Sequence, residues 1–65
     1  MMRWHCETVQ CDREGYYFPR WDLATPITVT AQTKQDAVNK VVAMMGQPRR
    51  GRYWGVRVLS VEEAS

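Results

Sequence analysis

The chain has 65 residues and a formal net charge of +2, so it has room for one domain, and its charge alone is too small to indicate nucleic-acid binding. Apolar residues make up 45% and charged residues 25%, which is typical of a globular domain and excludes a disordered tail. A chain this short buries roughly 60% of the surface that it exposes when unfolded. We therefore expect one small domain over residues 1–65, with a thin core and little volume for an enclosed active site.

The cysteine content and the hydropathy pattern predict a compartment. Only two cysteines occur, Cys6 and Cys11, whereas a secreted chain of this size usually carries four or more. No apolar run reaches the length of a signal-peptide core or a membrane span. We expect free thiols, a location in the cytoplasm of a bacterial cell (the host cell if the chain is phage-encoded) and no membrane partner.

The first predicted element is a strand over residues 2–10. Its residues alternate with a period of two, with Met2, Trp4 and Cys6 on one face and charged residues on the other. Residues 11–26 form a long connection that begins with a turn at Asp12-Arg13-Glu14-Gly15. Residues 16–18 fit a short additional strand that Pro19 ends, so the sheet has three or four strands.

A second strand over residues 27–31 and a helix over residues 33–45 follow. The strand is rich in β-branched residues. Thr33 is the expected N-cap, and Asp36 takes the reciprocal position of a capping box. Gly46 suits the C-cap, and Pro48 prevents continuation. One apolar stripe, which must face the sheet, contains Ala37, Val38, Val41, Val42 and Met45.

The last predicted strand covers residues 53–61 and changes its pattern midway. Trp54, Val56 and Val58 share one face, but Leu59 and Val61 have the opposite parity. Either a β-bulge resets the register, or the end of the strand is apolar on both faces.

Together these elements predict an α+β fold in ββαβ order, with an antiparallel sheet of three to four strands and one helix packed on one face. The other face is expected to be uncovered. It would carry Arg3, His5, Glu7, Thr28, Thr30 and Arg57, with Val9, Leu59 and Val61 toward its ends and Tyr53 near one end.

No residue pattern predicts catalysis or cofactor binding. A structural zinc site needs four ligands, usually in close pairs, but His5 and Cys6 point to opposite faces of a strand, and Cys11 is expected as a loop thiol. The acidic residues Asp12, Glu14 and Asp22 lie in a solvated loop, which does not separate the pKa values of an acid/base pair. We expect no enzyme activity, cofactor, metal or small-molecule ligand.

Two segments combine arginine with aromatic residues. Residues 47–54 contain Arg49, Arg50 and Arg52 beside Tyr53 and Trp54, and residues 16–21 repeat the mixture. These residue types occur at protein–protein hot spots and also in nucleic-acid sites, where arginine binds phosphate and aromatic rings stack on bases. The third alternative is structural, with Trp54 and Phe18 in the core and the arginines solvated. The candidate partner-binding residues are Arg49, Arg50, Arg52, Tyr53, Tyr16, Tyr17, Arg20 and Trp21.

A recognisable pattern runs from the second strand through the helix: Val29-x-Ala31-x-Thr33-x-x-Asp36-Ala37-x-x-Lys40-Val41, then Gly46 and a Trp54-Gly55-Val56-Arg57-Val58 strand. Over roughly residues 27–63 the chain resembles small β-β-α-β proteins of actinobacteria and their phages. Its strand–helix segment is similar to archaeal ribosomal LX proteins. The resemblance implies this fold and a phage or mobile-element origin, and it supplies no functional residues.

The interpretation that follows is a phage-type accessory protein that binds a host protein or itself. An uncovered sheet face, a thin core and free sheet edges favour a homodimer. The alternative is a nucleic-acid-binding module that uses the arginine-rich segment.

Overall fold

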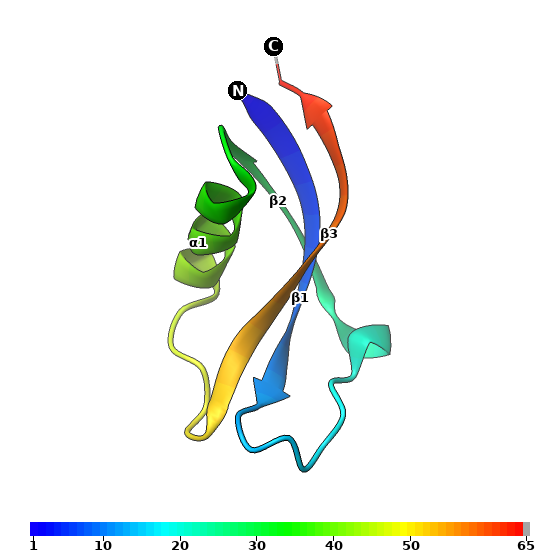
Figure 1. The fold of residues 1–65 in the computed structure, drawn as a ribbon, viewed down its shortest axis with the longest axis vertical. Coiled ribbons are helices and arrows are strands. Elements are labelled where there is room, and N and C mark those ends of the chain that lie inside the picture. Colours follow the sequence, from blue (N-terminus) through cyan, green and yellow to red (C-terminus); the bar gives the residue numbers. More distant parts are fainter. Residues whose placement is uncertain (65) are drawn as a thin grey trace.

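The computed structural model describes residues 1–64, and in them one antiparallel sheet of three strands carries one α-helix (Figure 1). The order of the strands is β2-β1-β3, which confirms the α+β class and the ββαβ order. The two long strands twist around each other, both termini lie at one end of the molecule, and the connections at residues 13–24 and 46–51 lie at the other (Figure 1). The elements are β1 (Met2–Asp12), the 3₁₀-helix η1 (Trp21–Leu23), β2 (Thr25–Ala31), α1 (Lys34–Met45) and β3 (Arg52–Glu63).

The predicted short strand at residues 16–18 is wrong, because a side chain uses the backbone groups that a strand would need. The Asp12 carboxylate accepts hydrogen bonds from the backbone N–H groups of Tyr16 and Tyr17 at 3.0 and 3.3 Å. These N–H groups therefore fold back onto the end of β1 and form a turn.

The helix begins and ends where the sequence predicts. Thr33 is the N-cap, and its Oγ1 accepts the Asp36 N–H at 3.1 Å. Gly46 ends the helix with a φ of +83°, a conformation that residues with a Cβ rarely adopt. Only the forward bond of the predicted capping box is observed, from Asp36 N–H to Thr33.

The main core lies between α1 and the sheet. Val41 and Ala37 of the helix are fully buried there, whereas Val42, at the margin of the stripe, is half-buried. Thr8 is also buried, and its hydroxyl donates to the Gly55 carbonyl at 2.8 Å. The buried cluster is Cys6, Val29, Ala31, Ala37 and Val41, with Trp4, Ile27, Met45, Val56 and Val58 packed around it.

A β-bulge explains the change of parity in β3. His5 pairs with Ser60 but Cys6 pairs with Val58, so Leu59 is an extra residue between them. Beyond the bulge, Val61 lies opposite Trp4, on the side of the sheet that the helix covers. The expectation that Val61 lies on the other face is therefore wrong, because one inserted residue exchanges the faces of all that follow.

The sequence predicted an uncovered second face of the sheet, and this is wrong at one end of it. A Cβ built on Gly55 would lie 3.4 Å from the Trp21 ring and 2.6 Å from Cys11 Sγ, so the indole packs directly on the backbone of β3. Arg57 lies over the same ring, 4.7 Å from its centroid, and also pairs with Glu7 at 3.2 Å. Cys11 is consequently a buried strand residue and not a loop thiol.

Candidate functional site

The connection between β1 and η1, which we call the aromatic loop (residues 13–20), is organised by one carboxylate. Asp12 accepts backbone N–H bonds from Glu14 at 3.0 Å and from the two tyrosines described above. These bonds, the one from Glu14 first, hold the pKa of Asp12 below its usual value, and the nearby Arg52 charge adds to the effect. The carboxylate is thus an anchor for the loop backbone and not merely a surface charge.

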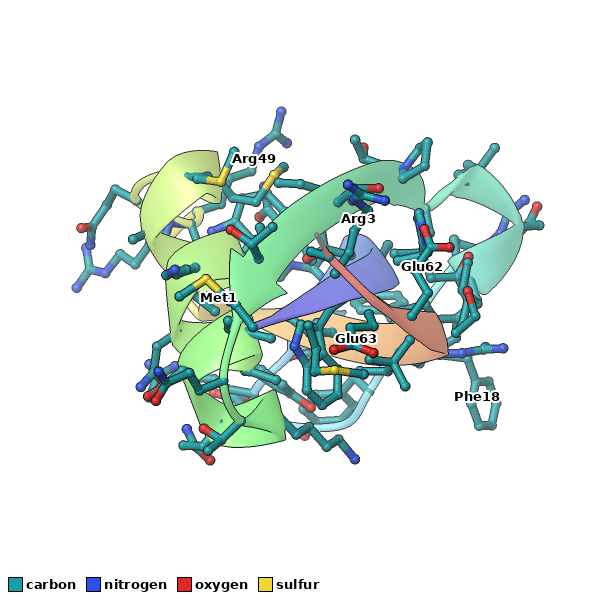
Figure 2. The ribbon with its side chains drawn as sticks, turned by 90° about the horizontal axis from the view of Figure 1, so that it is seen from above. Met1, Arg3, Phe18, Arg49, Glu62 and Glu63 are labelled. Carbon is teal, nitrogen blue, oxygen red and sulfur yellow. The ribbon has the colours of Figure 1, made fainter. Side chains whose placement is uncertain are left out.

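Three consecutive aromatic side chains project from this loop into solvent. Tyr16 is 79% exposed, Tyr17 69% and Phe18 92%. The structural alternative, in which Phe18 fills the core, is therefore wrong. Phe18 follows the turn that Asp12 holds, and its side chain projects away from the sheet (Figure 2). Clustered exposed apolar side chains are uncommon on a monomeric soluble protein and mark interaction surfaces.

The aromatic loop contacts the connection between α1 and β3, which we call the arginine loop (residues 46–51). The Arg13 N–H donates to the Gly51 carbonyl at 3.0 Å, and the Arg52 guanidinium lies 5.7 Å from the centroid of the Tyr17 ring. The Arg49 N–H donates to Gln10 Oε1 at 3.2 Å. Backbone contacts thus fix both loops against the same end of the β1–β3 pair.

The side chains of the two loops nevertheless diverge. Figure 2, a view along the long axis, shows Phe18 projecting away from the sheet on the side opposite Arg49. The structure brings together Tyr17 and Arg52 and separates Phe18 from Arg49. The aromatic and basic candidates therefore meet at Tyr17 and Arg52, whereas Phe18 and Arg49 do not share one surface.

Of three further candidates, two are engaged within the molecule. Arg20 makes two hydrogen bonds to Asp22, at 3.0 and 2.9 Å, and these lower the pKa of Asp22. Trp21 is half-buried on the sheet, as described above. Tyr53 pairs with Cys11 on the face without the helix, as expected, and is partly exposed. The side chains of Arg20 and Trp21 therefore make contacts within the molecule, whereas the Tyr53 side chain is exposed.

Sequence reasoning missed a polar cluster at the other end of the helix-free face. His5 Nε2 lies 2.7 Å from Glu62 Oε1, and its Nδ1 lies 3.1 Å from Thr28 Oγ1. Arg3 also donates to Glu62, at 3.2 Å. The pKa of Glu62 is lowered by these hydrogen bonds, first by that from His5 and then by that from Arg3. Only the register of β3 beyond the bulge brings Glu62 here, so strand alternation alone could not have found it.

The cluster connects all three strands, because His5 belongs to β1, Thr28 to β2 and Glu62 to β3. All its members are partly exposed at the surface of the sheet. Its geometry suits cross-strand stabilisation.

Within residues 1–64, no three His, Cys, Asp or Glu side chains are placed to hold a metal ion. Burial raises the pKa of the Cys6 thiol. The part of the chain that the structure describes has no helix long and apolar enough to cross a membrane.

The chain matches no protein-family model, and no curated protein or solved structure shows significant similarity to it.

Proposed function

We propose that this chain is a small accessory protein that binds a host protein through its aromatic loop. One observation carries the proposal: three adjacent aromatic side chains are mostly exposed on a loop whose backbone is held by Asp12. A tethered loop loses less conformational entropy on binding than a free one, so more of the contact energy becomes affinity. Tyrosine in particular is enriched among the residues that dominate protein interfaces.

The charges around the loop favour a partner with acidic groups. Arg13, Arg49 and Arg50 are exposed, and none of them forms a salt bridge within residues 1–64. Acidic groups on the partner, around an apolar pocket that accepts Phe18, would complement Arg13, which belongs to the aromatic loop. The phage-type origin of the protein stays a prediction from the resemblance at residues 27–63. A second copy of the chain is the other protein partner that the sequence favours.

Nucleic-acid binding is the second candidate function, and the unpaired Arg49 and Arg50 are the observation in its favour. A site for single strands combines phosphate-binding arginines with stacking rings along one groove. Here Phe18 and Arg49 lie on opposite sides of the molecule (Figure 2), so they do not face one surface along which a single strand would run. For this reason we rank a protein partner first.

A pull-down from a bacterial lysate, with and without nuclease, tests the ranking. Tyr16 and Phe18 are highly exposed, so changing both to Ser removes apolar surface without disturbing the core. The matched control changes Arg49 and Arg50 to Ala. We expect a partner that survives nuclease, is lost with the aromatic variant and is retained by the arginine variant. A partner that nuclease removes, or that only the arginine variant loses, contradicts the proposal.

Two further measurements distinguish the alternatives. Light scattering that gives the monomer mass of 7.6 kDa at high micromolar concentration excludes self-association as the function. If Arg49, Arg50 and Arg52 bind phosphates, affinity for duplex DNA should fall with salt with a log–log slope of about −2.7, at about 0.9 per phosphate. We expect no nucleic-acid complex tighter than micromolar at physiological salt. A sub-micromolar complex that is lost when all three become Ala promotes the second candidate.

A further inference from the structure

An open groove with a volume of about 310 Å³ lies between β2 and α1, and it shares no residue with the aromatic or arginine loop. Val29 and Lys40 contribute to it from the strand and the helix, and Met44 forms an exposed apolar wall. Its full lining is Thr28, Val29, Thr30, Lys40 and Met44. Because the strand order is β2-β1-β3, no strand within residues 1–64 covers the outer edge of β2 (Figure 1).

The backbone groups on the outer edge of β2 differ in how many hydrogen-bonding partners they can offer. The Lys40 ammonium donates to the Thr30 carbonyl, which identifies Thr30 as a residue whose backbone faces outward. Alternate residues of a strand direct their backbone groups to the same side, so Pro26 and Thr28 also face outward. Pro26 has no N–H to offer. Along this edge Pro26 therefore offers a carbonyl only, Thr30 offers its N–H while Lys40 holds its carbonyl, and Thr28 offers both a donor and an acceptor.

We propose that this groove binds an extended peptide segment that carries one carboxylate. The Thr28 N–H and C=O would pair with the peptide backbone, as in other complexes in which a peptide adds a strand to a sheet edge. From Pro26 to Thr30 the edge spans roughly 13 Å, at about 3.3 Å per residue. The site thus takes about four peptide residues, with one side chain against Met44.

Lys40 determines the charge of the occupant. It is the only ionisable side chain in the lining, and in the free protein it satisfies the Thr30 carbonyl. An incoming peptide N–H takes over that carbonyl, and the released ammonium pairs with the peptide carboxylate. A second copy of β2 fits less well, because the segment Thr25–Ala31 contains no acidic side chain. The Lys40 of each copy would then lack a counter-charge.

Selection from a displayed library of random heptapeptides tests the site. We expect enriched sequences that alternate β-branched residues and carry one Asp or Glu. A synthetic enriched peptide should slow hydrogen exchange at the Thr28 amide. Exchange of its acidic residue for the matching amide should weaken binding roughly tenfold, the effect of one charge-assisted hydrogen bond.

Two exposed lysines of α1 provide the matched variants, since Lys34 lies on the same helix outside the groove. Lys40→Met should abolish the difference between the acidic peptide and its amide form, while Lys34→Met should preserve it. Met44→Gln should weaken both peptides alike. The proposal is overturned if no sequence is enriched, or if the carboxylate preference survives in Lys40→Met. It is also overturned if Lys40→Met dimerises with a protected Thr28 amide, because Lys40 then only guards the edge against a second copy.

Discussion

The two faces of the sheet are built from alternate residues of the same strands, but different interactions hold them. On one face, α1 buries an apolar cluster around Cys6 and Val41. On the other, hydrogen bonds of His5 and Glu62 connect the strands at one end, and Trp21 packs on Gly55 at the other. The first face depends on the hydrophobic effect over a continuous area, and the second depends on a few specific contacts.

This difference shows how a short chain stabilises a sheet with one helix. A single helix is too small to cover both faces, and residues 1–64 contain no second α-helix. A 3₁₀ turn with one tryptophan and a few charged pairs replace it. The comparison predicts a large loss of folding stability for changes on the helix-covered face and an intermediate loss at Trp21 and Gly55. Changes at the polar cluster and in the aromatic loop should cause only a small loss of stability.

The largest effect is expected for Val41→Asp. Val41 is fully buried under α1, so the change places an unpaired charge in the core, at a cost of several kcal/mol. A domain of this size is stable by only roughly 3–10 kcal/mol. Circular dichroism should show an unfolded chain at 25 °C. Asn39→Asp, at an exposed position of the same helix, should fold normally. A cooperative melt of Val41→Asp near that of the wild type would mean that another face of α1 meets the sheet.

An intermediate effect is expected for Gly55→Ala. The added Cβ would lie 2.6 Å from Cys11 Sγ and 3.4 Å from the Trp21 ring, and overpacking of this kind costs about 1–3 kcal/mol. Urea denaturation should show the loss. Cys11→Ala in the same chain removes the closest atom and should recover part of the stability. If the two changes prove additive, Cys11 and Gly55 are not in contact, and Trp21 does not cover this face as described.

A smaller, pH-dependent effect is expected for Glu62→Gln. The pKa of Glu62 is lowered in the folded state. Its contribution is therefore fully present above its unfolded pKa and is lost as the pH falls through the folded value. The urea midpoint of the variant should lie below that of the wild type at pH 7, and the two should converge toward pH 3. Glu63→Gln, next to it in β3, is the control and should change neither midpoint. A difference that is equal at both pH values would show that the ion pair is not its cause.

The smallest effect on global stability is expected for Asp12→Ala. The change removes the acceptor of three backbone N–H groups in the exposed aromatic loop, far from the main core. The melting temperature should change little, while hydrogen exchange at the amides of Glu14, Tyr16 and Tyr17 becomes faster. Glu14→Ala should leave these rates unaltered. Partner capture should weaken with Asp12→Ala, because the loop must then be ordered on binding.

Local patterns in the sequence predicted most of the fold. The caps at Thr33 and Gly46 and the apolar stripe placed α1 to within one residue at its start, because they act within one or two turns of chain. Period-two alternation located the three strands, with one or two residues missing at an end of each. The candidate site was predicted only in part: the aromatic loop was identified, but its exposure and its separation from Arg49 were not.

Tertiary structure decided the features that depend on residues far apart in the chain. Trp21 had no clear pattern around it, and its place on the sheet follows from the absence of a side chain at Gly55, 34 positions later. The bulge at Leu59 was one of two alternatives in the sequence, and the pairing of β3 with β1 selected it. That selection also brought Glu62 to His5. The sequence by itself determined which segments are strands and which is the helix, because propensity and capping are local. Which faces are covered, and by what, was decided by strand register and packing, because both depend on contacts that form only when the whole chain folds.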